Sequence, residues 1–321
     1  MGKRIILLFA SLGLLLGCGL RSGNQPRPGS QPQPEVREFP RMEVPAMLSD
    51  IQDRMSWIAE HFWDGFTRTD KCWHCDSVTV NGVDMEQVEA QMGVFATLLE
   101  QASPADGKRG MEALYSRIAA FQQAFPEANV FPEMVRLTEF YFYDPNSPVR
   151  SEELYLPFVS LLAESGLVDP ARRPAYAWAA RMCALNRPGT PAADFDFIDT
   201  KGRQRTLYGI RAEWTLLVFG NPDCNACKEL TADISGDEYL NGLVREGTLQ
   251  VVDIYIDEDI DAWKERMEAY PKDWINGYDP KHIIREDLIY NIRAVPSLYL
   301  LDKEKRVVLK DATPEQVFSL L

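Results

Sequence analysis

Basic residues are scarce in this sequence. Its 321 residues include 34 lysines and arginines against 48 aspartates and glutamates, which gives a formal net charge of −14 at pH 7. Proteins that bind DNA or RNA replace the counterions of the phosphates with clustered basic side chains. Because no basic stripe is present, we expect no nucleic acid partner, and the acidic surface mainly favours solubility.

Histidine is also rare, since the chain contains only three. A structural zinc site needs four ligands, usually from two pairs of cysteine or histidine. Cys72 and Cys75 form one CxxC pair, but no second pair lies nearby, and His74 falls between the cysteines, where it does not match a haem site. We therefore expect no metal. A disulfide between Cys72 and Cys75 is the favoured interpretation, while an auxiliary redox pair or two free thiols remain open.

The apolar run at the N-terminus is too short to span a bilayer. Ile5 to Gly17 contains thirteen residues, whereas a spanning helix needs about 20. The run follows the basic Lys3 and Arg4 and ends directly before Cys18, which resembles a bacterial lipoprotein signal. The resemblance implies a signal peptide of residues 1–17 and lipid attachment at Cys18. An uncleaved anchor and an ordinary signal peptide are the alternatives.

Residues 18–45 are predicted to form a lipidated, flexible tether. They are rich in proline, glutamine, arginine, glycine and serine and show almost no apolar periodicity. Gly19 offers no acidic retention signal after Cys18. We therefore expect the protein to be anchored in the inner leaflet of the outer membrane, facing the periplasm.

Residues 46–187 are predicted to form an all-α domain of five or six helices, because apolar residues recur at helical spacing. Strand-like alternation is confined to residues 77–80, before the turn Asn81-Gly82. The string AEHFWDGF resembles the start of an uncharacterised helical domain of lipoproteins, which implies no chemistry. Cys183 is expected to be buried. The aromatic residues expected to pack in the core or between domains are Trp57, Phe62, Trp63, Phe66, Phe140, Tyr141 and Phe142.

A second CxxC pair, Cys224 and Cys227, directly follows the apolar run 214–219 and the turn 220–223. A buried strand that ends in a tight turn and delivers CxxC to a helix start is typical of thiol–disulfide exchange sites. The spacing puts both sulfurs on the first helical turn, where the helix N-terminus stabilises a thiolate on the first. A static disulfide and half of a zinc site are the alternatives.

Pro296 stands at the head of another apolar run, residues 297–301. An X-Pro bond at a strand start is a candidate cis peptide bond. We expect Val295–Pro296 to be cis and to pack beside the CxxC pair. The Val295 backbone would then be free to pair with an extended peptide as an added strand.

Residues 188–321 resemble the thioredoxin superfamily, in its TlpA/ResA-like or AhpC/TSA-like branch. The landmarks, in family order, are PGTPAADFDFIDTKG, TLLVFGNPDCNAC, LQVVDIYID and YNIRAVPSLYLLDKEKRVV. The resemblance implies an α/β thioredoxin-like domain, a mixed sheet flanked by helices, after the all-α domain of a multidomain chain. In the added segment 271–291, we expect KDWINGYDP to be a loop and residues 281–290 a helix.

The resemblance also implies a function, that of a periplasmic thiol–disulfide oxidoreductase. Cys224 would be the nucleophile and Cys227 the resolving thiol, because the first cysteine lies at the exposed helix start. Protein or peptide disulfides would be the substrates and a membrane thiol carrier the electron donor, with no cofactor besides the redox-active disulfide. The resemblance favours reduction, although the sequence does not fix the direction.

Two departures from the family pattern concern protons and charge. Asp223 replaces the usual tryptophan and opposes thiolate formation at Cys224, and Val218 replaces a buried aspartate, which leaves no obvious general base.

A peroxiredoxin-like peroxidase is one alternative function, but Asn221 stands where its threonine is expected and no arginine is close. A non-catalytic lipoprotein binding module with a thioredoxin-like scaffold is the other alternative.

Overall fold

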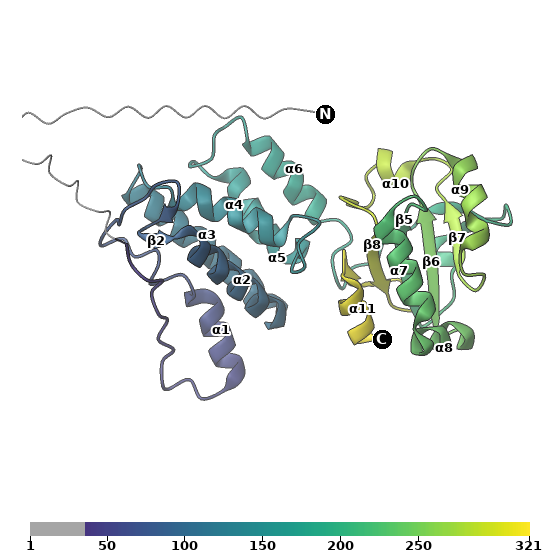
Figure 1. Ribbon diagram of the computed structural model, residues 1–321, viewed down its shortest axis with the longest axis horizontal. Helices are drawn as coiled ribbons and strands as arrows, with labels where there is room; N and C mark the ends of the chain where they lie inside the picture. The colour runs from purple at the N-terminus through teal and green to yellow at the C-terminus, as the bar shows by residue number, and fades with distance from the viewer. Residues whose placement is uncertain (1–35) are drawn as a thin grey trace, which may run out of the picture. The chain divides into compact units, whose positions relative to one another are not determined.

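The computed structural model describes residues 36–321, in which a helical domain precedes an α/β domain (Figure 1). The predicted all-α domain is confirmed, with one small β-hairpin at the predicted turn Asn81-Gly82. Its elements within the described residues are α1 (Ile51–His61), β1 (Thr79–Val80), β2 (Val83–Asp84), α2 (Met85–Gln101), α3 (Pro104–Ala124), α4 (Val130–Phe142), α5 (Glu152–Glu164) and α6 (Arg173–Cys183).

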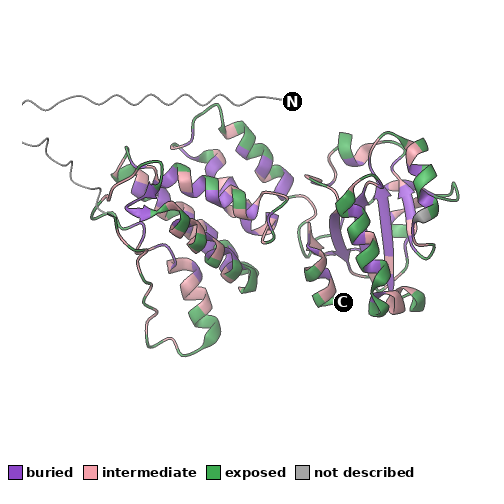
Figure 2. Ribbon diagram, viewed as in Figure 1, coloured by how far each residue is buried: buried purple, intermediate pink, exposed green. Residues whose placement is uncertain are grey.

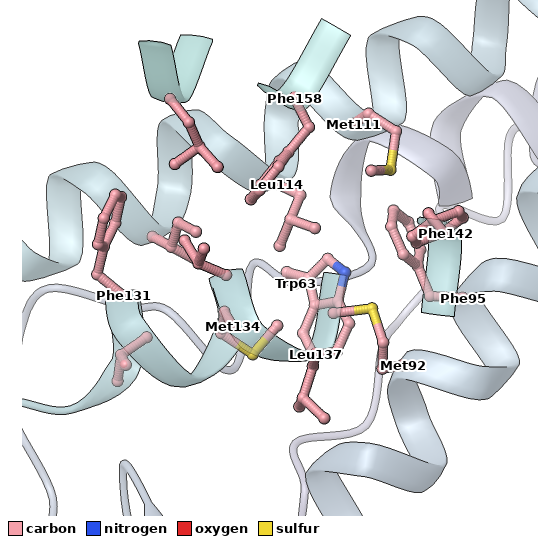
Figure 3. Close-up of a cluster of buried hydrophobic side chains, with 14 of the residues drawn as sticks. Trp63, Met92, Phe95, Met111, Leu114, Phe131, Met134, Leu137, Phe142 and Phe158 are labelled. Carbon is pink, nitrogen blue, oxygen red and sulfur yellow. The ribbon is translucent and has the colours of Figure 1, made fainter. Parts of the chain in front are cut away.

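Apolar faces of the six helices meet in one core, part of which is shown in Figure 3. Trp63 is 1% exposed and contacts Phe95 edge to face. Of the aromatic residues predicted to pack in the core or between domains, two do not belong to the core, since Phe140 is 50% exposed and Trp57 is half-buried, stacked on His61. An isolated aromatic residue on the solvent side of a helix does not disturb the helical period, so the sequence alone did not separate these two from the core.

The predicted tether is wrong over its last residues, because part of it packs on the helical domain. Arg37 Nε donates a hydrogen bond to the Asn81 carbonyl at 2.9 Å. The Phe39 ring stacks on Phe66 and meets Trp63 edge to face, with centroid distances of 5.4 and 5.7 Å. The remaining part of the tether up to residue 35, with Cys18 and the signal peptide, lies outside the described residues.

The α/β domain has a seven-stranded mixed sheet, whose strand order is β4-β3-β7-β6-β5-β8-β9. β5 is central, pairing parallel with β6 and antiparallel with β8. Its strands are β3 (Asp196–Asp199), β4 (Gln204–Thr206), β5 (Trp214–Gly220), β6 (Leu249–Tyr255), β7 (Ile275–Tyr278), β8 (Ser297–Leu301) and β9 (Val307–Lys310). Its α-helices are α7 (Asn225–Gly236), α8 (Glu238–Glu246), α9 (Ile260–Arg266), α10 (Ile283–Glu286) and α11 (Pro314–Leu320).

Alternating residues of β5 face opposite sides of the sheet, and helices cover both sides. Leu216 and Val218 pack with residues of α7, α8 and α11, whereas Leu217 and Phe219 pack with a cluster that includes Ile284 of α10. Figure 2 shows that the central strands are buried almost throughout. The predicted flanked mixed sheet is therefore confirmed.

The added segment was predicted incorrectly. Residues expected to form a loop include β7, which pairs with both β6 and β3, and the expected helix 281–290 is reduced to α10. Gly277 within this strand is needed for close packing. A Cβ at Gly277 would lie 2.6 Å from the Phe197 ring and 2.8 Å from the Ile198 carbonyl oxygen.

Within the described part of the chain, no helix is both long enough and apolar enough to cross a membrane.

Candidate active site

Cys224 and Cys227 lie at the N-terminus of α7, directly after the central strand. Cys224 is the N-cap residue, and its sulfur accepts a hydrogen bond from the Cys227 N–H at 3.3 Å. Cys224 is half-buried, whereas Cys227 is only 3% exposed. Burial, reinforced by the hydrogen bond with Cys224, raises the pKa of the Cys227 thiol. The arrangement therefore makes Cys224 the accessible sulfur and keeps Cys227 protonated behind it.

Val295 and Pro296 lie beside this pair. The Val295–Pro296 peptide bond is cis, and the Cys224 thiol donates to the Val295 carbonyl over a sulfur–oxygen distance of 3.5 Å. The chain thus brings together residues 71 positions apart. The expected geometry is present, while a role of Val295 in holding substrate stays a prediction.

Asp253 is a buried carboxyl group behind the cysteines that the sequence analysis missed. It lies on β6, paired in register with Val218 of β5, and is 8% exposed. Burial raises the pKa of Asp253 from 3.8 to about 7, and its charge acts on the Cys227 thiol. A Cβ at Gly220 would lie 3.0 Å from Asp253 Oδ1, so the glycine leaves room for the carboxyl group.

The sequence suggested no obvious general base, but the structure places a buried carboxyl group on the neighbouring strand, at the residue that pairs with Val218. One signal was available, since Asp253 is the only charged residue within the apolar run of β6. Its proximity to Cys227 depends on the register between β5 and β6, which the sequence did not specify.

A cavity of about 510 Å³ lies between α7 and the segment that follows α9. Tyr270 and Thr231 line it. The Tyr270 phenol is hydrogen-bonded to Thr231, and burial raises its pKa, with smaller contributions from the charges of Asp253 and Cys227. Tyr270 therefore lines a cavity that is large enough to hold water or part of a ligand.

Arg266 occupies another position that was not foreseen. Its guanidinium forms an ion pair with Asp223 at 2.5 Å. The inference that no arginine lies close to the CxxC pair is therefore wrong, because the fold brings Arg266 next to Asp223 although the two are far apart in the sequence. Arg266 therefore offsets the negative charge that Asp223 places next to Cys224.

The other cysteines lie in the helical domain. Cys72 and Cys75 both donate to the Trp73 carbonyl, at 3.4 and 3.6 Å, and all five described cysteines are free thiols. The disulfide favoured for this pair is thus not formed in this structure and remains a prediction for the oxidised protein. Cys183 is fully buried, as predicted. Among the described residues, no cluster of three or more histidine, cysteine or acidic side chains is arranged to hold a metal.

A family model for a domain of unknown function, DUF5106, matches residues 17–183, which is more than half of the chain. The chain belongs to the DUF5106 family. The DUF5106 match ends at the last residue of α6, so the α/β domain follows it directly. A search of curated proteins found no match.

Solved structures extend the comparison of this DUF5106 protein. A thioredoxin-like protein from Bacteroides caccae is 29% identical, with a TM-score of 0.77, covering 89% of this chain and 98% of that one. The C-terminal domain of an uncharacterized protein from Bacteroides fragilis is 43% identical over 42% of this chain and 97% of its own, with a TM-score of 0.42. A domain of a possible thiol-disulfide isomerase from Cytophaga hutchinsonii is 27% identical over 43% of this chain and 92% of its own, with a TM-score of 0.38. The first similarity confirms the thioredoxin-like fold.

Proposed function

We propose that the protein is a thiol–disulfide oxidoreductase that reduces protein or peptide disulfides through Cys224 and Cys227. The observation that carries the proposal is the geometry of the pair. A half-buried sulfur caps a helix, a buried thiol with a raised pKa lies one turn further on, and a backbone carbonyl lies 3.5 Å from the first sulfur. A static disulfide requires none of these features.

In the first step, the Cys224 thiolate attacks one sulfur of a substrate disulfide. A sulfur–sulfur bond forms between Cys224 and that sulfur, the substrate disulfide breaks, and the second substrate sulfur leaves as a thiolate that takes up a proton. The N-terminus of α7 and the Cys227 N–H stabilise negative charge on the Cys224 sulfur. A peptide that pairs with the Val295 backbone would hold its disulfide next to Cys224.

In the second step, Cys227 loses its proton to Asp253 and attacks the Cys224 sulfur. The Cys224–Cys227 disulfide forms, the mixed disulfide breaks, and the remaining substrate sulfur leaves as a thiol after protonation. The protein dithiol has then lost two electrons and two protons, and the substrate has gained them. A carboxyl group with a pKa of about 7 suits this transfer, because it accepts and releases protons near neutral pH.

Each turnover leaves the protein oxidised, so a reductant must restore the dithiol. We assign this role to a membrane thiol carrier and the reaction to the periplasm, with the protein anchored through a lipid on Cys18 in the inner leaflet of the outer membrane. Labelling of growing cells with a tagged fatty acid tests the anchor. Label should appear on the wild-type protein and be absent from Cys18→Ala, and equal labelling of both would contradict the proposal.

Trapping of mixed disulfides tests the exchange reaction. In Cys227→Ser the second step is blocked, so a disulfide-bonded peptide should accumulate as a covalent adduct on Cys224, detectable by mass spectrometry under non-reducing conditions. Cys183→Ser is the matched control, because that thiol is fully buried in the core of the helical domain and should form no adduct. A non-catalytic scaffold predicts no adduct, and a peroxidase predicts consumption of peroxide instead.

A further inference from the structure

The carboxylate of Glu152, at the start of α5 in the helical domain, is buried against groups of the α/β domain. Its side chain is 1% exposed. Oε1 accepts hydrogen bonds from Asn291 Nδ2 at 2.5 Å and from Arg293 Nε at 2.9 Å. Oε2 forms an ion pair with Lys310 Nζ at 2.7 Å. One carboxylate from the helical domain thus binds three side chains of the α/β domain.

Further contacts hold these partners in place. Arg293 forms a second ion pair with Asp311 at 2.5 Å, and its guanidinium lies 4.5 Å from the centroid of the Tyr143 ring. Lys310 Nζ also donates to the Cys183 carbonyl at 2.8 Å. Arg293 is therefore held by Glu152 and the Tyr143 ring of the helical domain and by Asp311, the residue after β9.

The anchored residues flank the segment that faces Cys224. Arg293 precedes Val295 by two residues, and Ser297, directly after Pro296, lies 3.5 Å from Asp311 through its hydroxyl group. Buried ion pairs add little net stability, but they restrict geometry, since each partner is costly to leave unpaired. This arrangement is suited to holding one short segment at a fixed distance from a reacting sulfur.

We propose that Glu152 is a positioning residue, through which the helical domain holds residues 291–297 in the geometry that presents Val295 to a peptide next to Cys224. This inference rests on the proposed exchange function. It gives the domain of unknown function a specific task, which is to complete the peptide-binding side of a site whose cysteines lie in the other domain.

The test compares Glu152→Gln with Glu153→Gln in the full chain. Glu153 is the next residue of α5 and pairs with the exposed Arg187, so its substitution removes an ion pair of the same helix without touching residues 291–297. Two readouts are needed. Hydrogen–deuterium exchange of residues 291–297 reports the anchoring, and reduction kinetics with a peptide disulfide and with 5,5′-dithiobis(2-nitrobenzoate) separate peptide positioning from cysteine reactivity.

Glu152→Gln should speed deuterium uptake in residues 291–297 and lower kcat/KM for the peptide by about tenfold or more, mainly through KM, because small misplacements of a bound substrate are costly. The rate with the small disulfide should stay within about threefold, since that reagent needs no strand pairing. Glu153→Gln should match the wild type in both. Unchanged uptake, or equal losses with both substrates, would overturn the proposal.

A second variant covers the case in which Glu152→Gln does not fold. Asn291→Ala removes the hydrogen bonds of the uncharged amide to Glu152 and Tyr143 and leaves both cations paired with Glu152, and a smaller shift in the same direction is expected. No shift in deuterium uptake or peptide KM would count against positioning. If the wild type reduced no disulfide at all, the proposed function would fail, while the deuterium uptake would still decide whether Glu152 anchors the segment.

Discussion

Asp253 explains how a buried thiol can take part in exchange near neutral pH. Cys227 is shielded from solvent, and burial raises its pKa, so it needs a neighbouring acceptor for its proton. Asp253 lies on β6, its charge acts on the Cys227 thiol, and burial raises its own pKa to about 7. In the proposed mechanism, the carboxyl group takes part in the second step of exchange and not in the first.

The Asp253→Asn variant should therefore form the mixed disulfide normally and resolve it slowly. We expect resolution to slow by about hundredfold, the lower range for removal of a general base. Acid-quenched single turnovers with a peptide disulfide measure both steps. Asp261→Asn, which changes a 94% exposed side chain, is the control. An Asp253→Asn variant that resolves at the wild-type rate would exclude Asp253 as the proton acceptor.

Asp253 also makes the stability of the reduced protein depend on pH. Its pKa is about 7 in the folded protein against an ordinary value of 3.8, so the folded state binds the proton more tightly than the unfolded state. The resulting stabilisation of the folded state is fully present below about pH 4 and is lost as the pH rises through 7. The free energy of unfolding falls by up to about 4 kcal/mol over this range. The amide of the Asp253→Asn variant cannot titrate. Urea unfolding at about pH 5 and about pH 8 measures the free energy of unfolding of both proteins. Relative to the wild type, the variant should be more stable at pH 8 than at pH 5, and the same difference at both pH values would contradict the assignment.

At the scale of elements, the sequence predicted what depends on local pattern. Helical periodicity identified the helices of the first domain, and the strand-turn-CxxC order located Cys224 at the start of α7. What it could not predict depends on contacts between distant segments. β7 has a turn-like Asn-Gly sequence and is a strand because β6 and β3 pair with it, while Asp253 and Arg266 approach the cysteines only through strand register and helix packing.

Residues 37–39 illustrate the same difference, since their composition suggests a tether and their contacts make them part of the helical domain. Phe39→Ala should lower the free energy of unfolding by about 2 kcal/mol, because the ring is partly buried against Trp63 and Phe66. Phe140→Ala removes the same side chain from a site that is 50% exposed and should cost less than about 0.5 kcal/mol. Denaturant unfolding of both variants measures the difference, and equal effects would mean that residues 37–39 do not contribute to the fold.

At the scale of the whole molecule, the five cysteines other than Cys18 should fall into two pairs and one single thiol. We expect Cys224–Cys227 and Cys72–Cys75 disulfides in the oxidised protein, because each pair is close in sequence and space. Cys183 should stay reduced, since burial raises the pKa of its thiol to about 12 and thiolates are the reactive species. Mass mapping of non-reduced protein tests this. A bond from Cys72 to Cys224 or Cys227 would instead make the first pair part of the electron path.

Reduction of insulin disulfides tests the central claim most directly. With dithiothreitol as the electron source, the wild-type protein should accelerate the precipitation of the insulin B chain well above the rate with dithiothreitol alone. Cys224→Ser should abolish the acceleration, and Asp261→Asn, which changes a 94% exposed side chain, should leave it unchanged. Acceleration that survives Cys224→Ser, or a wild-type protein that gives none, would contradict the assignment of thiol–disulfide exchange to this pair.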